Sequence, residues 1–419
     1  MSGGRPRRIE SDGAFRAATP RQLEVLRIIR DRGVITRAEI AELLGSSASQ
    51  VSRLTSPLIS QRLVTVEPRL PLVEGRPTEL LALADDTHYV VGLDIGGLAQ
   101  DAVVTNLRGA IIGSAHAAGA PPDSHAAIIE RLMRLIDVAI AAASISDTQI
   151  MGAGAGVRAI IDPVSGIITA GPETPAWSPL WVDFDLRDQL SRALPWPGVV
   201  VDDTVRALAA AERRYGKAAG YDDFVYVLAD TGIGATLMID GHPYIGPRHL
   251  AGEIGHITLI PDGALCGCGR RGCVEQYAST SAMIEQGQQI DPSIATIEEL
   301  IARADSGDER MRTILAAGGA ALGRAIAILL NLLSPALIVL GGRAITSQDY
   351  LEQARTTAKA ESLDQPFRAA RIVTSDAGAH SGAQGAATLM LDELFSPSDQ
   401  KLATHSNSRH RLAANRSMS

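Results

Sequence analysis

Apolar residues recur at helical spacing in three short segments near the N-terminus. The first segment predicts a helix over residues 19–32 that ends at Gly33. Thr36 followed by Glu39 has the spacing of a capping box, so a second helix is expected to begin there. A third helix is predicted over 46–58.

Two apolar segments at 63–66 and 79–83 then resemble strands, with a turn-rich stretch between them at 68–77. Three helices followed by a two-stranded ribbon is the element order of a winged helix-turn-helix. In that motif the last helix lies in the major groove of DNA.

From residue 86 the pattern changes to short buried strands that alternate with longer helices. Strands are predicted over 89–97, 101–106, 110–114, 150–160, 199–203, 224–229, 234–240, 336–342 and 371–374. Helices are predicted over 124–143, 204–215, 318–333 and 381–391. Two successive blocks of strands and helices indicate an α/β fold with two lobes and a cleft between them.

These patterns divide the chain into four parts. Residues 1–18 and 396–419 are polar and are expected to be disordered. Residues 19–85 form the predicted DNA-binding domain, and residues 86–395 form the two-lobed α/β domain. The chain has no uninterrupted apolar run of 18 residues and no signal-peptide pattern. We therefore expect a cytoplasmic protein that has no membrane contact.

Charge is unevenly distributed along the chain. The first 85 residues carry 13 Arg against 10 Asp or Glu, whereas the rest carries 26 Lys or Arg against 37 acidic residues. A basic segment on an acidic body is typical of a small nucleic-acid module attached to a larger domain. A merely solvated charged surface is the alternative, and charge alone does not decide between them.

Candidate DNA-contacting residues lie on the third predicted helix and at the tip of the ribbon. On the helix, glutamine can pair with adenine and arginine with guanine. Arg76, at the ribbon tip, suits a narrow minor groove. Each polar residue on the helix can equally be a solvated surface residue. The candidates on the helix are Ser47, Ser49, Gln50, Ser52 and Arg53.

The three cysteines of the chain all lie within eight residues, at Cys266, Cys268 and Cys273. This spacing on a glycine-rich loop predicts a metal site rather than disulfides. Three thiolates require a fourth ligand for a closed tetrahedral zinc site, and His256 is the nearest candidate. Four protein ligands leave no open position, so we expect one structural Zn²⁺ per chain.

The segment that surrounds these cysteines resembles a known family. Residues 251–256 read Ala-Gly-Glu-Ile-Gly-His, and residues 272–275, which include the third cysteine, read Gly-Cys-Val-Glu. Together with Asp-Ile-Gly-Gly at 94–97, they resemble the ROK family (repressor, open reading frame, kinase) over residues 19–392. The N-terminal helix-turn-helix resembles the repressor branch, which includes xylose and N-acetylglucosamine repressors.

The resemblance implies an actin-like, ribonuclease-H-like double lobe that binds a monosaccharide in its cleft. It implies sugar contacts from Glu253, His256 and Glu275, with the histidine also binding zinc. The family's Asn-Asp pair falls on Asp202 and Asp203, and its second member is the catalytic base in the kinases. Without the resemblance, this pair is only an acidic turn.

The sequence departs from the kinase pattern of the family at several positions. Leu98 replaces a threonine in the first phosphate loop, Asp230 replaces a glycine in the second, and Arg343 replaces a glycine of the nucleotide turn. A carboxylate repels a triphosphate, whereas such loops bind phosphate through backbone N–H groups. The sugar loop carries Arg-Ala at 158–159 in place of Pro-Gly, and Asp202 replaces the asparagine. We therefore expect no enzyme activity, with Asp203 as a vestigial base.

The sequence leaves three functions open. The first is a repressor controlled by a sugar, binding an inverted-repeat DNA operator as a homodimer or homotetramer. The second is an ATP-dependent sugar kinase with an accessory DNA-binding module. The third is a repressor whose effector is a partner protein. The residues argue against the second and do not separate the first from the third. They do not identify the sugar, the operator or the sign of the response.

Overall fold

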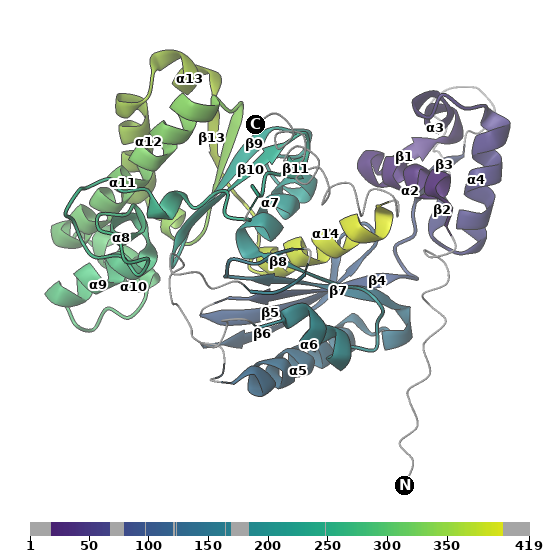
Figure 1. The fold of residues 1–419 in the computed structure, drawn as a ribbon, viewed down its shortest axis with the longest axis horizontal. Helices are drawn as coiled ribbons and strands as arrows, with labels where there is room; N and C mark the ends of the chain where they lie inside the picture. The colour runs from purple at the N-terminus through teal and green to yellow at the C-terminus, as the bar shows by residue number, and fades with distance from the viewer. Residues whose placement is uncertain are drawn as a thin grey trace, which may run out of the picture.

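The computed structural model describes residues 18–396 apart from 68–78, 97, 120, 121, 123, 164, 169–183 and 248 (Figure 1). The N-terminal part contains three helices and a three-stranded antiparallel sheet of order β1-β3-β2. The helices are α2 (Pro20–Arg32), α3 (Arg37–Leu43) and α4 (Ala48–Ser60), and the strands are β1 (Val34–Thr36), β2 (Val64–Glu67) and β3 (Leu80–Leu83). The sequence did not predict β1.

Local capping explains where these three helices begin, and α2 begins at a capping box of Thr19 and Gln22. Thr36 and Glu39 form the predicted capping box at the start of α3. Ser47 and Gln50 form another at the start of α4, so this helix begins two residues later than predicted. In a capping box the two side chains satisfy backbone N–H groups that would otherwise lack partners.

Two five-stranded sheets follow, and their strands are arranged in the same way. In each sheet a three-stranded antiparallel meander is extended by two parallel strands, in the orders β6-β5-β4-β7-β8 and β11-β10-β9-β12-β13. The first sheet contains β4 (Tyr89–Ile95), β5 (Ala99–Asn106), β6 (Ile111–Ala118), β7 (Ile150–Val157) and β8 (Val199–Asp203). The second contains β9 (Phe224–Ala229), β10 (Ile233–Ile239), β11 (His242–Pro243), β12 (Leu337–Gly341) and β13 (Arg371–Thr374). The expected pair of α/β lobes is confirmed.

Helices cover the faces of both sheets (Figure 1). In the first lobe these are α5 (His125–Ala143), α6 (Leu186–Ala193), α7 (Thr204–Tyr215) and α14 (Ser381–Phe395). In the second lobe they are α8 (Glu275–Ala278), α9 (Thr280–Ile290), α10 (Ile297–Asp305), α11 (Glu309–Leu333), α12 (Gln348–Glu361) and α13 (Asp364–Ala369). Helix α11 starts nine residues before its predicted start at 318.

Helices α7 and α14 pack against each other; α7 contacts both sheets, and α14 packs on the first. Leu208 and Ala209 of α7 share a core with β9 and β12 of the second sheet, whereas α14 packs on β4 and β7 of the first. Gly385 allows the two helices to approach closely, because a Cβ at this position would lie 2.1 Å from the Ala207 carbonyl oxygen. The two helices therefore join the lobes.

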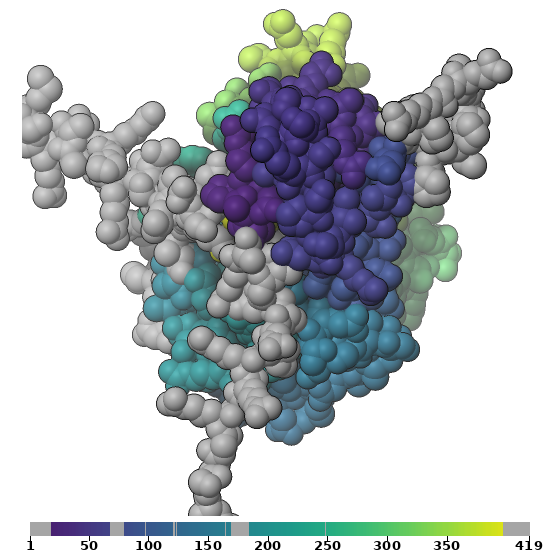
Figure 2. Space-filling view, turned by 90° about the vertical axis from the view of Figure 1, so that its right-hand side faces the viewer, coloured from purple at the N-terminus to yellow at the C-terminus, as the bar shows by residue number. Residues whose placement is uncertain are grey.

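The N-terminal domain shares a hydrophobic core with the first lobe. Leu26 and Ile29 of α2 belong to the same buried cluster as Val90 of β4 and Phe395 of α14. In Figure 2 the purple surface of this domain stands above the blue surface of the first lobe. Burial of a common apolar surface fixes the N-terminal domain on the body of the protein.

Among the described helices, only α11 is long and apolar enough to cross a membrane. Its apolar window is 67% buried inside the second lobe, where it packs with α10 and α12. A long, largely buried apolar helix is also what the core of a large lobe requires.

Candidate functional site

A pair of aspartates ends β8 and begins α7. Asp203 caps α7, since its carboxylate accepts hydrogen bonds from the backbone N–H groups of Val205 at 2.8 Å and Arg206 at 3.2 Å. Asp202 is buried and accepts a hydrogen bond of 2.6 Å from Nε of Arg206. The two neighbouring carboxylates therefore have different surroundings, and Asp202 is neutralised by a buried guanidinium.

Arg206 was not among the residues that the sequence singled out. Its side chain is 7% exposed, and it lies four residues after Asp202, in the first turn of α7. That spacing was the available signal, because an arginine in the first turn of a helix can reach back to a carboxylate at the end of the preceding strand. Burial of an arginine requires a carboxylate partner of this kind.

The second lobe contributes two glutamates to the same region. Glu253 directly precedes the short 3-10 helix Ile254–His256, and Glu275 is the first residue of α8. The Glu275 carboxylate accepts a hydrogen bond of 3.1 Å from the backbone N–H of Ile233. Burial raises the pKa of Glu253 to about 7, and the nearby Asp203 and Glu275 carboxylates act in the same direction. The structure thus brings acidic groups from both lobes together.

Asp94, at the end of β4, lies close to this group. The hydroxyl of Thr204, the first residue of α7, donates a hydrogen bond of 3.3 Å to it. Burial, reinforced by the Asp101 carboxylate, raises the pKa of Asp94 to about 7. Buried acids with raised pKa values that lie close to one another are typical of ligand sites.

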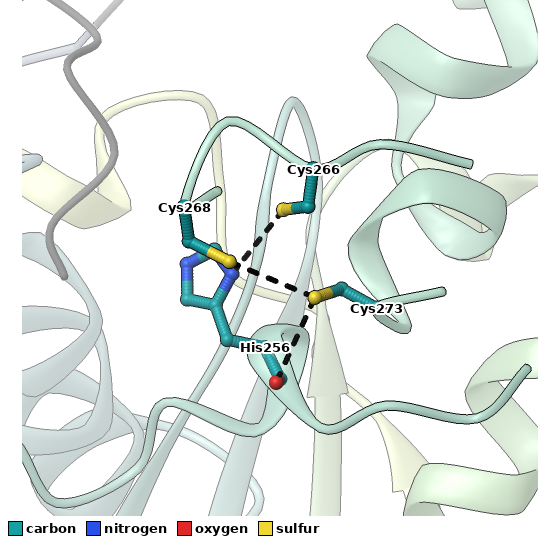
Figure 3. A group of neighbouring side chains, drawn as sticks. All are labelled: His256, Cys266, Cys268 and Cys273. Atoms are coloured by element: carbon teal, nitrogen blue, oxygen red, sulfur yellow. Dashed lines mark hydrogen bonds between the residues drawn. The ribbon is translucent and has the colours of Figure 1, made fainter. Parts of the chain in front are cut away.

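The predicted metal ligands lie together (Figure 3). One donor atom from each of His256, Cys266, Cys268 and Cys273 lies within 4.8 Å of all the others. Cys268 Sγ is 3.7 Å from Cys273 Sγ, and Cys266 Sγ is 3.6 Å from His256 Nδ1. A tetrahedral zinc ion with bonds of about 2.3 Å to sulfur holds its ligands roughly 3.8 Å apart. These four residues can therefore hold a metal ion of that size.

A short hairpin presents the cysteines. The backbone N–H of Cys266 donates to the Arg270 carbonyl at 2.7 Å, which closes the loop that carries Cys268. Gly272 has a φ of 73°, and a Cβ there would lie 1.7 Å from the Ile260 carbonyl oxygen, so only glycine fits. Burial raises the pKa of the Cys273 thiol to about 12. A bound metal would be needed to stabilise its thiolate at neutral pH.

His256 faces both the cysteines and the acidic group. Its Nδ1 points toward Cys266, whereas its Nε2 lies 3.9 Å from a carboxylate oxygen of Glu253. An imidazole that binds a metal through one nitrogen has its ring orientation fixed, so the other nitrogen is aimed precisely. The side chain of His256 therefore links the metal site to the cluster of Asp203, Glu253 and Glu275.

The DNA-contact candidates on the first turns of α4 are all exposed, namely Ser47, Ser49, Gln50, Ser52 and Arg53. Two of them have a structural role as well, since Ser47 and Gln50 form the capping box of α4. Arg76 lies outside the described residues.

Comparison with known proteins places this geometry in context. The ROK family model matches residues 90–393. A xylose repressor from Caldicellulosiruptor bescii is 26% identical over 90% of this chain and 96% of its own length.

Two solved structures have similar folds. One is a ROK family glucokinase from Streptomyces griseus in complex with glucose and AMPPNP; it is 25% identical over 73% of this chain and 99% of its own, with a TM-score of 0.64. The other is a ROK family transcriptional regulator, a homolog of the Escherichia coli MLC protein. It covers 93% of this chain and 96% of its own at 21% identity, with a TM-score of 0.72, which is a likeness of fold. The expected sugar-kinase-type fold is confirmed.

Proposed function

This chain belongs to the ROK family, and from that premise we propose that it is a transcriptional repressor whose affinity for DNA is controlled by a sugar. The xylose repressor that matches nearly its whole length supports this function. The sugar would bind in the cleft between the lobes, and the N-terminal domain would bind the operator.

One observation carries the proposal. Helix α7 begins among the acidic groups, where Asp203 caps it, and ends against the N-terminal domain. Near its end, Arg214 Nη1 lies 2.8 Å from a carboxylate oxygen of Asp31 in α2. A single helix therefore touches both the candidate ligand site and the candidate DNA-binding domain, which is the connection that a ligand-controlled repressor needs.

The N-terminal helices and sheet have the order of a winged helix-turn-helix, with α4 as the helix that enters the major groove. We assign base or phosphate contacts to the exposed residues of α4, with Arg53 as the strongest candidate, and a minor-groove contact to Arg76. Two copies in a homodimer or homotetramer would read the two halves of an inverted repeat.

For the sugar, the available groups are mostly hydrogen-bond acceptors, which suit a ligand rich in hydroxyl groups. We assign the contacts to Asp203, Glu253, His256 and Glu275. Asp202 is a weaker candidate than the sequence suggested, because Arg206 already occupies its carboxylate. A structural zinc ion on the three cysteines and His256 would hold the imidazole in place for the sugar. All these components are consistent with a cytoplasmic protein.

The kinase alternative is favoured by the retained Asp203 and by the likeness to a glucokinase structure. Against it, Leu98 has no hydroxyl to offer a phosphate and is 52% exposed, and the Asp230 carboxylate is paired with Arg343. We therefore expect no ATP-dependent phosphorylation of common hexoses and amino sugars. A coupled assay that finds turnover of ~1–100 s⁻¹, the ordinary range of kinases, would contradict this.

The function can be tested in two steps. A thermal-shift screen of monosaccharides and sugar phosphates, including D-xylose and N-acetylglucosamine, should find a ligand that raises the melting temperature. Selection of operator DNA from a random pool, followed by footprinting, should then give one inverted repeat. Binding that is salt-sensitive but has no preferred site would exclude a repressor.

A further inference from the structure

Asp230 and Arg343, the two residues of the second lobe that depart from the kinase pattern, lie next to each other in space. Asp230 follows the last residue of β9, and Arg343 follows β12 by two positions. These strands are parallel neighbours, with Gly341 paired to Leu228. From β9 the chain continues to β10 on one side of this pair, and from β12 it continues to β13 on the other side. The carboxyl ends of strands at such a switch point are where open α/β sheets bind ligands.

Four donor contacts surround the Asp230 carboxylate. The Arg343 guanidinium donates to it from Nη2 at 2.7 Å and from Nε at 3.2 Å. The backbone N–H groups of Thr231 and Arg343 donate at 2.6 Å and 3.2 Å. Although burial acts to raise the pKa of Asp230, the Arg343 contacts hold it below its usual value. The carboxylate is therefore ionised at neutral pH.

A guanidinium fork combined with two backbone N–H groups is a set of donors that suits an oxyanion such as phosphate. Here the anion belongs to the protein itself. A tethered group has a high effective concentration, so a free phosphate must compete with it at a disadvantage. The guanidinium also lies 3.7 Å from Glu298, which further lowers the positive charge available to an external anion.

We propose that Asp230 is a built-in substitute for phosphate, and that its carboxylate fills an oxyanion site formed by Arg343 and the backbone N–H groups of Thr231 and Arg343. Removal of the carboxylate uncovers a site for phosphate or diphosphate groups. The second lobe thereby keeps its strand ends ordered without a nucleotide. The role of Asp230 is independent of DNA binding and of sugar control.

The test uses inorganic pyrophosphate as the probe and the full chain as the protein. Isothermal titration should find that Asp230→Ala binds pyrophosphate at least about tenfold more tightly than the unchanged protein, as expected for gaining one charge-assisted contact. The double variant Asp230→Ala/Arg343→Ala should lose this gain. Asp308→Ala is a matched control, because Asp308 also pairs with an arginine at 2.8 Å and its side chain is likewise 21% exposed.

A destabilised variant remains informative. If Asp230→Ala melts at a lower temperature than the unchanged protein, pyrophosphate should raise its melting temperature more than it raises that of the Asp308→Ala control. Asp230→Asn, which keeps the side-chain shape without the charge, should give a smaller gain of the same sign. Two results would overturn the proposal. One is equal pyrophosphate affinity in the unchanged protein and Asp230→Ala, and the other is a double variant that binds pyrophosphate as tightly as Asp230→Ala does.

Discussion

At the scale of single residues, His256 connects two kinds of chemistry. Its Nδ1 faces the thiols and its Nε2 faces Glu253, so the orientation of the ring matters to both. The thiol side is closed, because the three cysteines are 7% exposed or less. A metal ion enclosed in this way serves to hold the loop and the imidazole rather than to activate a substrate.

We expect about one zinc ion per chain, the number that one closed four-ligand site holds. Elemental analysis of purified protein measures this directly, and well under one metal ion per chain would exclude the site. Cys273→Ser should lose the metal and lower the melting temperature, because structural zinc contributes to folding. A strong chelator should affect the unchanged protein in the same direction and leave Cys273→Ser unaffected.

Asp94 provides a prediction about pH. Its pKa rises on folding from 3.8 to about 7, so between these values the folded chain binds more protons than the unfolded chain. Stability must then fall as the pH rises through this window. Asp94→Asn removes that loss and keeps an acceptor for the Thr204 hydroxyl. The variant should be more stable than the unchanged protein at pH 8, by up to about 4 kcal/mol, and the advantage should shrink toward pH 4.

Melting curves at pH 4, 6 and 8 test this prediction. Asp308→Asn is the control whose effect on stability should depend on pH in the opposite direction. The reason is that the hydrogen bond with Arg310 lowers the pKa of Asp308 to about 2. An Asp94→Asn advantage that is independent of pH would show that the carboxyl group is not the cause.

At the scale of elements, α4 carries the predicted DNA contacts. Arg53 is exposed on the first half of the helix, beside Ser49 and Ser52. Arg53→Ala should weaken specific binding by ~1–3 kcal/mol if the guanidinium reads a base. Arg368→Ala is the matched control, because Arg368 is 79% exposed but lies in α13. Operator titrations at fixed salt measure the affinity of both variants. An equal loss of affinity in the two would mean that Arg53 acts only through the net charge of the protein.

The sequence predicted elements well where local signals are strong. The bounds of β8, α7 and β9 match the prediction, since each has an unbroken apolar or helical pattern with a clear end. Helix α12 was missed because its buried positions include Ala354, Thr357 and Ala358, which give a weak apolar period. Helix α10 was missed although Thr296 and Glu299 form a readable capping box.

In the candidate site, too, the sequence identified residues that have a local signal and missed contacts that have none. The spacing of the cysteines and the nearby His256 identified the four candidate metal ligands, and family resemblance identified the acidic residues. The Asp230–Arg343 pair joins residues 113 positions apart, and no local pattern indicates that they meet. Their identities suggested a damaged phosphate site, whereas the structure shows that the two changes satisfy each other.

At the scale of the whole molecule, two helices connect the lobes to α2. Helix α7 ends at α2 through Arg214 and Asp31, at 2.8 Å. Helix α14 begins beside Asp94, since a Cβ on Gly382 would lie 2.1 Å from its carboxylate. It ends where Asp392 lies 2.6 Å from Nη1 of Arg30 in α2. A relative shift of the lobes on ligand binding would therefore reach α2 at two points.

The last prediction concerns this coupling. A sugar that binds the cleft should change operator affinity by roughly 5–150-fold, the usual range of allosteric coupling, and operator DNA must change sugar affinity by the same factor. Glu253→Ala should bind operator normally and lose the response. Arg214→Ala should bind both ligands but show a smaller coupling factor. Arg213→Ala is its matched control, because the neighbouring Arg213 pairs at the same 2.8 Å with Asp222, which lies outside α2. DNA titrations with and without the sugar from the thermal-shift screen measure the coupling factor of all four proteins.

If Arg213→Ala and Arg214→Ala reduce the coupling equally, α7 does not transmit the effect of the sugar through Asp31. If the sugar binds tightly to the unchanged protein yet shifts operator affinity by less than about twofold, below the usual range of coupling, the cleft is not the control site. A partner protein would then be the effector to seek.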